Sequence, residues 1–275
     1  MPPAPVQPSL GRKAMTAHTV ASFDQELKFL DAAIARMGGL AEEQLQTALC
    51  AIAQADPDQA RQAAASDAAI DAMQHEIEEC AINIIARRQP VAVDLRCIIG
   101  ATRIAADLER IGDMAKNIGK RIRSFDENAW LSPMTKGLCG MGDAALRQLK
   151  AVLDSYSQRD SELALKVWLG DEEIDRRCEA LFQDLLKYMM EHPEKVPHAA
   201  HLILSVKNIE RIGDHCTNIA EAVTYITKGQ ALSGERPRFD AWTSEPGEGS
   251  PHAGVSATSK AGDPGPAPRV AMIDA

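Results

Sequence analysis

A ten-residue segment occurs twice in this chain, and its recurrence constrains the fold more than any other feature. The first copy, Glu109–Ile118, reads ERIGDMAKNI, and the second, Glu210–Ile219, reads ERIGDHCTNI. Seven of the ten positions are identical, and the copies are offset by 101 residues, about the size of one small domain. A repeat of this period predicts that a structural unit has been duplicated within the chain.

The residues between the two ends of the chain follow a helical pattern. Ala, Leu, Ile and Met are abundant while aromatic residues make up only 4% of the 275 residues, which favours helices with an aliphatic core. Asp56 followed by Pro57 is typical of a helix start, and Gly229 of a helix end. The pattern predicts six helices, over residues 18–53, 57–89, 90–124, 134–157, 160–191 and 197–228. Three long helices, repeated once, predict an all-α protein of two tandem antiparallel three-helix bundles.

Composition sets the predicted domain boundaries. Residues 1–17 are rich in proline and residues 232–275 in Pro, Gly and Ser, so neither segment can bury a core and both are expected to be disordered. The first bundle is predicted over residues 18–125 and the second over residues 130–230.

The helix predicted over residues 90–124 carries an apolar seam with steps of four and three residues, as left-handed bundle packing requires. The seam consists of Cys97, Ala101, Ile104, Leu108, Ile111, Ala115, Ile118 and Ile122. Gly112 and Gly213 lie inside predicted helices, where glycine is unfavourable by about 1 kcal/mol relative to alanine. Their recurrence predicts the close approach of a second helix.

Acidic residues recur at helical spacing away from the seam. Glu109, Asp113 and Asn117 lie four residues apart and share one helix face. The second copy repeats this spacing, and the preceding helix of each half adds a pair of aspartates. Because crowded carboxylates repel one another, a hard cation such as Mg²⁺, Mn²⁺ or ferric iron would stabilise them. We therefore predict metal sites at Asp67, Asp71, Glu109, Asp113, Asp171, Asp175, Glu210 and Asp214. A solvated acidic helix face is the alternative.

Several classes of function are disfavoured. The net charge of −9 argues against nucleic-acid binding. No apolar run is long enough to span a membrane, and four prolines interrupt the N-terminus where a signal peptide would need an apolar core, which favours a cytoplasmic protein. The six cysteines form no C-x-x-C pair and are expected to be free thiols. No nucleophile lies beside a base in any recognisable motif, so we expect no enzyme.

The chain resembles the PhoU family. The resemblance covers residues 18–229, and its motifs are Phe23–Leu27, Met37–Gly39, Ile84–Pro90, Asp94–Arg96, Tyr188–Met190 and the two ERIGD copies. It implies two three-helix bundles with pseudo-twofold symmetry, often dimeric, that act in the cytoplasm as a negative regulator of the phosphate-starvation response. It also implies contacts with a sensor histidine kinase and with the ATPase subunit of the phosphate ABC transporter. Family members can hold metal clusters, so iron, manganese, magnesium or zinc is expected at the carboxylates named above.

The sequence departs from an equal duplication in one segment. Arg87–Pro90 followed by Asp94–Arg96 has no copy before the second motif, where the chain reads His192–Pro197. The partner surface is therefore placed on the first bundle, at Arg87, Arg88, Asp94 and Arg96. Asp94 and Arg96 are equally well explained as first-turn residues that help to start the third helix. Arg110 and Arg211 are expected to point away from the carboxylates, toward another helix or a partner.

Three functions remain open at this point. The first is a signalling adaptor without catalysis, which is the function that the resemblance implies. The second is a metal-binding protein with a homeostatic or structural role. The third, metal-assisted phosphate hydrolysis, needs paired metals with an open coordination position, which no residue pattern establishes.

Overall fold

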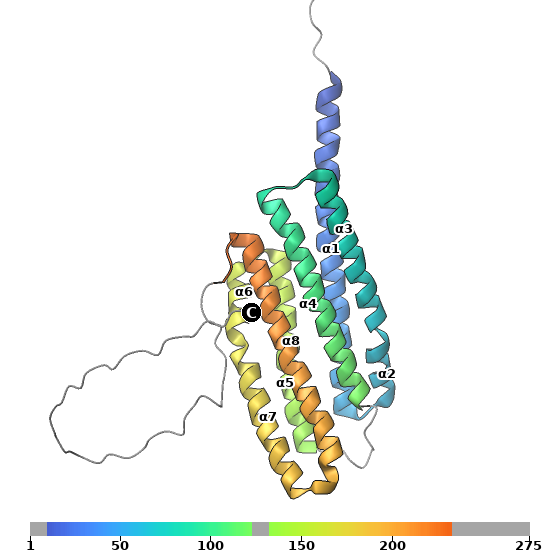
Figure 1. The fold of residues 1–275 in the computed structure, drawn as a ribbon, viewed down its shortest axis with the longest axis vertical. Coiled ribbons are helices and arrows are strands. Elements are labelled where there is room, and N and C mark those ends of the chain that lie inside the picture. The colour runs from blue at the N-terminus through green and yellow to red at the C-terminus, as the bar shows by residue number, and fades with distance from the viewer. Residues whose placement is uncertain (1–9, 123–131, 233–275) are drawn as a thin grey trace, which may run out of the picture. The chain divides into compact units, whose positions relative to one another are not determined.

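The computed structural model describes residues 10–122 and 132–232, and within these ranges the chain is α-helical without a strand. The first half contains α1 (Leu10–Gln54), α2 (Pro57–Ala65), α3 (Asp67–Arg88) and α4 (Ala92–Ile122) (Figure 1). The second half contains α5 (Ser132–Gln158), α6 (Ser161–Gly170), α7 (Glu172–Glu191), a 3₁₀ turn (Pro193–Lys195) and α8 (Val196–Lys228). The predicted all-α class is confirmed.

Each half is a three-helix bundle whose middle helix is interrupted once. The sequence predicted unbroken helices over residues 57–89 and 160–191, and this is wrong at Ser66 and at Asp171. In an unbroken helix the carbonyl oxygen of Ala63 would accept from the backbone N–H four residues later. Instead it accepts from the Gln44 side chain of α1 at 2.9 Å. The carbonyl oxygen of Val167 accepts from Gln148 of α5 at 3.3 Å in the same way.

The helix ends follow the predicted chemistry closely. The Asp56 carboxylate accepts from the N–H groups of Asp58 and Gln59, so it caps α2, and Asp160 caps α6 in the same manner. Gly229 ends α8 with a left-handed φ of 72°. The predicted cap at Asp56 and stop at Gly229 are thus confirmed.

Two boundaries differ from the prediction. Helix α1 begins at Leu10 and not at residue 18, two positions after Pro8, the last proline of the N-terminal segment. Residues Ser132 and Pro133 begin α5 instead of lying in a loop, as proline is well tolerated in a first helical turn. The predicted disorder of residues 1–9 and 233–275 lies outside the described residues.

The two halves share one continuous apolar core. Helices α4 and α8 form the most extensive helix pair, and α1 also packs on α5. The predicted seam of α4 is buried from Ala101 to Ile118, and apolar residues of α8 such as Ile212 and Ile219 belong to the same cluster. The bundles therefore do not have separate hydrophobic interiors.

Polar contacts fix α4 against α8 at the edge of this core. The Oδ1 atom of Asp107 lies 2.8 Å from His215 Nδ1 and accepts from Asn218 Nδ2 at 3.1 Å. Further along, the Arg103 guanidinium stacks on the Tyr225 ring at 5.4 Å from its centroid. Asn218, the last polar residue of the second motif copy, thus faces the other half instead of the carboxylates of its own half.

A close helix contact in the first half yields a stability prediction. A Cβ atom built on Gly119 of α4 would lie 2.9 Å from the backbone oxygen of Ala60 in α2. Because a backbone atom cannot move aside cheaply, we expect Gly119→Ala to lower the free energy of unfolding by about 1–3 kcal/mol. Urea denaturation followed by circular dichroism measures the change.

Gly39 in α1 is the matched control, because a Cβ atom built there meets nothing within 4 Å. Gly39→Ala should raise the free energy of unfolding by about 0.5–1 kcal/mol, since alanine favours the helix. Equal effects of the two substitutions would contradict the close packing of α2 on α4.

Candidate functional site

The first carboxylate cluster consists of Asp67, Asp71, Glu109 and Asp113, from α3 and α4. Asp67 is the first residue of α3, so the interruption of the middle helix carries its side chain toward α4, and only 8% of the residue is exposed. The other three residues are half-buried. The predicted proximity of the two acidic pairs is supported by the pKa of Glu109. Burial raises that pKa, Arg110 opposes the rise, and the charges of Asp113, Asp71 and Asp67 add to it.

A lysine ammonium lies inside this first carboxylate cluster. Lys116 Nζ donates to Asp113 Oδ1 at 2.5 Å and also to Asp67 Oδ2, so it joins the acidic residues of α3 and α4. Burial alone would lower the pKa of Lys116, but the hydrogen bonds to Asp113 and Asp67 outweigh it and raise that pKa above its usual range. Lys116 therefore stays charged at every physiological pH and partly neutralises the first cluster.

Arg110 contributes a second positive charge at the same cluster. Its Nε atom lies 3.4 Å from Glu109 Oε2, and its Nη1 atom lies 3.9 Å from Asp113 Oδ2. The prediction that Arg110 points away from the carboxylates is therefore wrong. The side chain is long enough to bend back along the helix surface, where a residue three positions away is a close neighbour.

The second carboxylate cluster consists of Asp171, Asp175, Glu210 and Asp214, from the α6–α7 junction, α7 and α8. Asp171 is only 1% exposed, and its Oδ1 atom accepts from Gln148 Nε2 at 3.1 Å. A Cβ atom built on Gly213 would lie 2.6 Å from the same oxygen. Glycine at this position therefore allows the buried carboxylate to approach the α8 backbone, and the close approach predicted at Gly213 is confirmed.

A lysine is present in the second half too, but it enters from a different position. Lys207 Nζ donates to Glu210 Oε1 at 2.9 Å and lies 3.9 Å from Cys178 Sγ. Burial raises the pKa of Cys178 to about 11; Lys207 opposes the rise, and nearby carboxylates, first Glu210, add to it. At the position of Lys116 the second half has Thr217, whose hydroxyl donates to the Asp214 carbonyl oxygen at 2.7 Å.

Gln44 and Gln148 are functional candidates that the sequence analysis missed. Each donates to the interrupted middle helix of its half, and each has a buried Oε1 atom without a donor among the described residues. The signal was a second repeat, since Gln44–Leu45 and Gln148–Leu149 share the offset of 104 that relates Asp67 to Asp171. A repeat of only two residues is too short to indicate that its glutamine has a role.

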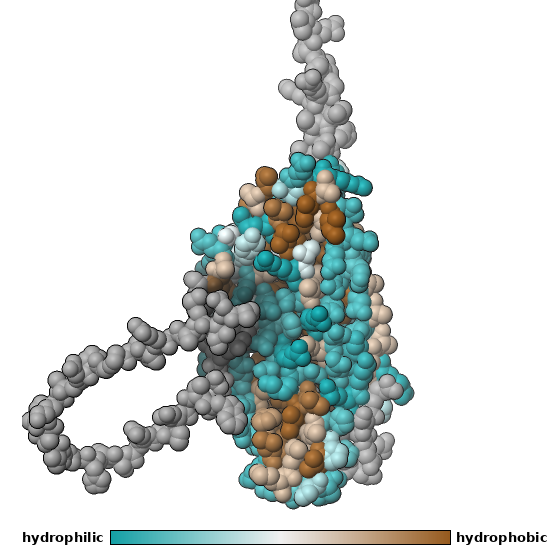
Figure 2. Space-filling view, viewed as in Figure 1, coloured by the Kyte–Doolittle hydropathy of each residue, from teal (hydrophilic) through white to brown (hydrophobic). Residues whose placement is uncertain are grey.

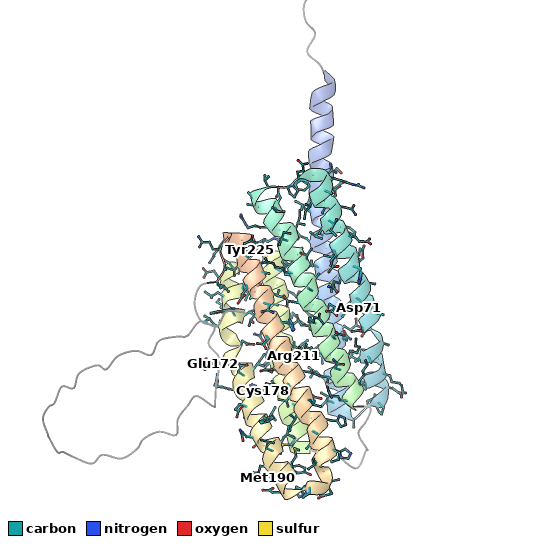
Figure 3. All side chains as sticks on the ribbon, in the orientation of Figure 1. Asp71, Glu172, Cys178, Met190, Arg211 and Tyr225 are labelled. Carbon is teal, nitrogen blue, oxygen red and sulfur yellow. The ribbon has the colours of Figure 1, made fainter. Side chains whose placement is uncertain are left out.

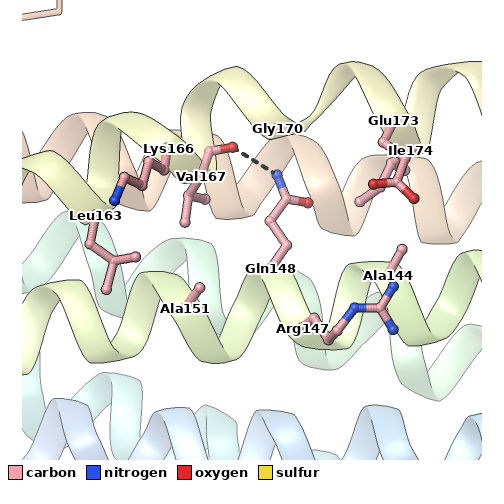
Figure 4. Close-up of a pocket in the computed structure, with 10 residues that line it drawn as sticks. All are labelled: Ala144, Arg147, Gln148, Ala151, Leu163, Lys166, Val167, Gly170, Glu173 and Ile174. Carbon is pink, nitrogen blue, oxygen red and sulfur yellow. Dashed lines mark hydrogen bonds between the residues drawn. The ribbon is translucent and has the colours of Figure 1, made fainter.

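A surface pocket of about 240 Å³ opens beside Gln148 where α6 meets α7. Its lining includes Ala144 and Ala151 from α5, and the bond from Gln148 to Val167 crosses it (Figure 4). Arg147 and Lys166 lie at opposite ends of the pocket in this view. The pocket thus does not gather positive charge at one point, as an anion site would require.

The two clusters differ in how well they suit a metal ion. No group of three or more His, Cys, Asp or Glu side chains in the described part of the chain is already arranged to hold one. In the first cluster, Lys116 lies between two of the predicted ligands. In the second cluster, the equivalent Thr217 is uncharged, and the four carboxylates are oxygen ligands of the type that hard cations prefer. The donor chemistry therefore fits a cation better in the second half.

Comparisons with known proteins identify the family. The family model described as "PhoU domain" matches residues 34–122 and 138–223. The chain belongs to the PhoU family. It is 45% identical over 226 residues to a "Phosphate-specific transport system accessory protein PhoU homolog" from Caulobacter vibrioides (strain NA1000 / CB15N), covering 82% of this chain and 98% of that protein. A homolog of the same description from Rhizobium meliloti (strain 1021) is 45% identical over 224 residues, covering 82% and 94%.

Solved structures of PhoU proteins share the fold. The crystal structure of PhoU from Pseudomonas aeruginosa has a TM-score of 0.70 and 34% identity, covering 76% of this chain and all of that one (100%). The phosphate transport system regulatory protein PhoU from Streptococcus pneumoniae has a TM-score of 0.71 and 28% identity, covering 77% and 99%. None of the described helices is long and apolar enough to cross a membrane.

The side chains that the sequence analysis assigned to partner binding differ from one another in exposure and contacts. Arg87 and Arg211 are exposed, and Asp94 is half-buried in the first turn of α4. Arg96 packs against the C-terminal end of α8, because its Cζ atom lies 3.2 Å from a Cβ atom built on Gly229. Arg88 is held by α1, where its guanidinium donates to Glu26 at 2.8 and 2.9 Å and to Ser22 at 2.7 Å. Arg88 thus joins the end of α3 to α1.

Exposed apolar side chains gather at opposite ends of the helices (Figure 2). Where α3 runs into α4, Val91 is 73% and Val93 is 53% exposed. Met190 lies where α7 runs into α8 (Figure 3). It is 76% exposed. The segments that contain these two turns differ in length, since Glu109 follows Asp71 by 38 positions and Glu210 follows Asp175 by 35.

The Arg88–Glu26 pair yields a prediction on pH. The hydrogen bond from Arg88 lowers the pKa of Glu26 below 4.5, although burial opposes this. A lowered carboxyl pKa stabilises the folded state above the unfolded pKa, and this contribution disappears as the pH falls through the folded value. We therefore expect Glu26→Gln to lower the free energy of unfolding near pH 7 and to have little effect near pH 3.

Urea denaturation at intervals between these two pH values tests this prediction. Glu43→Gln is the matched control, because Glu43 is an exposed glutamate of the same helix. A Glu26→Gln effect that stays constant over the whole pH range would show that the ionised carboxylate is not the stabilising group.

Proposed function

We propose that this chain is a cytoplasmic negative regulator of the phosphate-starvation response and of phosphate uptake. It acts as an adaptor between the ATPase subunit of the phosphate ABC transporter and a sensor histidine kinase. The observation that carries this proposal is that the PhoU domain matches both halves, together with relatives named as accessory proteins over nearly their whole length. In this proposal the protein has no catalytic activity, inserts into no membrane and binds no nucleic acid.

The α3–α4 turn is the surface proposed for partner docking. Val91 and Val93 offer exposed apolar area, and Arg87 and Asp94 lie beside them in sequence with charges for a polar rim. Arg211, exposed on α8, offers a second contact. Arg88 and Arg96 hold this turn in place through their contacts with α1 and with the end of α8. The family resemblance also favours a homodimer.

A metal ion is proposed as a structural partner of the second carboxylate cluster. Asp171, Asp175, Glu210 and Asp214 are the residues that would hold it, and iron, manganese, magnesium or zinc are the candidates. Such an ion would neutralise the carboxylates and join α7 to α8. If metal handling were itself the function, removing these carboxylates would abolish all activity, whereas an adaptor would tolerate their loss in part.

The regulatory role is tested with an alkaline phosphatase reporter in a deletion strain grown in excess phosphate. We expect high reporter output in the deletion strain and silencing by the wild-type protein, because the adaptor represses the response only when present. Complementation with Glu210→Gln/Asp214→Asn, at matched protein level, then separates the two functions. Full silencing by this variant favours the adaptor, and complete loss favours metal handling. Low output in the deletion strain itself would refute the regulatory proposal.

The docking surface is tested by changing one turn at a time. Val91→Ser/Val93→Ser should weaken binding to the purified kinase or ATPase subunit about tenfold or more, as expected when a central apolar contact is lost. Met190→Ser is the matched control, because it removes an equally exposed apolar side chain at the α7–α8 turn. Calorimetry with each partner gives the affinities. If only Met190→Ser weakened partner binding, the docking surface would lie at the α7–α8 turn and not at the α3–α4 turn.

A further inference from the structure

Lys116 occupies a central position in the first carboxylate cluster. Its ammonium bonds Asp67, which is almost fully buried, and Asp113, which lies one helical turn before it on α4. Its side chain is only 20% exposed. An ammonium held by one carboxylate from each of two helices neutralises them as a small cation would. Because the ammonium is part of the chain, its presence in the cluster does not depend on the concentration of a free ion.

The duplicated half has different residues at the corresponding positions. The offset of 101 residues that relates the two motif copies places Thr217 where the first half has Lys116. The charged lysine of the second half, Lys207, reaches Glu210 from the other end of the motif, and its counterpart in the first half is Ala106. Asp171, the counterpart of Asp67, is bonded by the neutral amide of Gln148. The two clusters thus have matching carboxylates and different cations.

We infer that Lys116 is a built-in substitute for a metal ion, so that the first carboxylate cluster of this chain excludes metal and any metal binding belongs to the second. The part that concerns the second cluster rests on the proposed function. A divalent ion entering the first cluster would have to displace the ammonium from Asp67 and Asp113. Lys116 would then remain half-buried without its partners, and leaving a buried charge unpaired is strongly unfavourable.

Arg110 strengthens the exclusion. With Lys116 it brings two positive charges to four carboxylates, and both cations are residues of α4 itself. A metal ion would therefore meet a cluster whose negative charge is already reduced by half. The second cluster has the same number of carboxylates. Its lysine, Lys207, contacts Glu210, and the arginine of its motif copy, Arg211, is exposed on α8 as Arg110 is on α4.

The experiment measures Mn²⁺ bound per full-length chain after dialysis, by elemental analysis and by the loss of the free-ion electron paramagnetic resonance signal. The variants are Lys116→Thr, which copies the second half into the first, and Thr217→Lys, which does the reverse. Lys120→Thr is the matched control, because Lys120 is an exposed lysine of the same helix and its loss changes the net charge equally.

We expect Lys116→Thr to bind about twice as much Mn²⁺ as the wild type, because a second oxygen cluster of the same kind becomes available. Thr217→Lys should lose most of the Mn²⁺, and Lys120→Thr should match the wild type. A Lys116→Thr protein that binds no more Mn²⁺ than the wild type would overturn the inference. If the wild type binds none and Lys116→Thr gains a site, the role of Lys116 stands and the proposed metal function fails; if neither binds, both fail.

Thermal unfolding supplies a second readout that does not depend on activity. Without metal, Lys116→Thr should unfold at a lower temperature than the wild type, because Asp67 and Asp113 lose their cation. Millimolar Mn²⁺ should raise the unfolding temperature of Lys116→Thr by more than that of Lys120→Thr, because only Lys116→Thr gains an ion at the first cluster in addition to the second. Equal stabilisation of both variants by Mn²⁺ would mean that the ion acts elsewhere, which would contradict the inference.

Discussion

The packing of α4 against α8 is the contact on which the rest of the structure depends. These two helices carry the repeated motif, and their apolar faces meet in one core shared by both halves. The faces of α4 and α8 outside this contact pack against the other helices of their own half. Because the motif glutamates and aspartates lie off the apolar seam, they are directed toward the broken middle helix. The position of both carboxylate clusters thus follows from the way in which the duplicated helices bury their apolar residues.

The break in each middle helix determines the most buried carboxylate of each cluster. A glutamine from the first helix of the half takes the carbonyl oxygen that an unbroken helix would use, at Ala63 in one half and at Val167 in the other. An aspartate is thereby carried inward against α4 or α8: Asp67, directly after the first break, is 8% exposed, and Asp171, at the second break, is 1% exposed. A buried carboxylate needs a strong donor nearby. The two halves meet this need differently, with Lys116 in the first and Gln148 in the second.

The sequence predicted those features that depend on local chemistry or on periodicity. The Asp56 cap, the Gly229 stop and the buried seam of α4 each follow from residues that act within one helix. The breaks at Ser66 and Asp171 were missed because Gln44 and Gln148 come from another helix, and both break residues keep right-handed helical dihedral angles. Arg110 was assigned to the wrong face because helical spacing describes Cβ directions and not the reach of a long side chain. The role of Lys116 could not be predicted, because it depends on how close α3 lies to α4, and residue spacing within one helix does not show this.

An adaptor that joins two different partners needs two different surfaces, and an exact duplication would offer the same surface twice. In this chain the differences are concentrated at the turns between the second and third long helices and at the cations of the clusters. The segment from Asp71 to Glu109 is three residues longer than its counterpart from Asp175 to Glu210. Two valines are exposed at the α3–α4 turn, while Met190 is exposed at the α7–α8 turn. A permanent ammonium fixes α3 to α4 under all conditions, whereas a bound ion would fix α7 to α8 only when it is available. In the proposed arrangement one half is a constant scaffold and the other is conditional, and this asymmetry arises from the difference between Lys116 and Thr217.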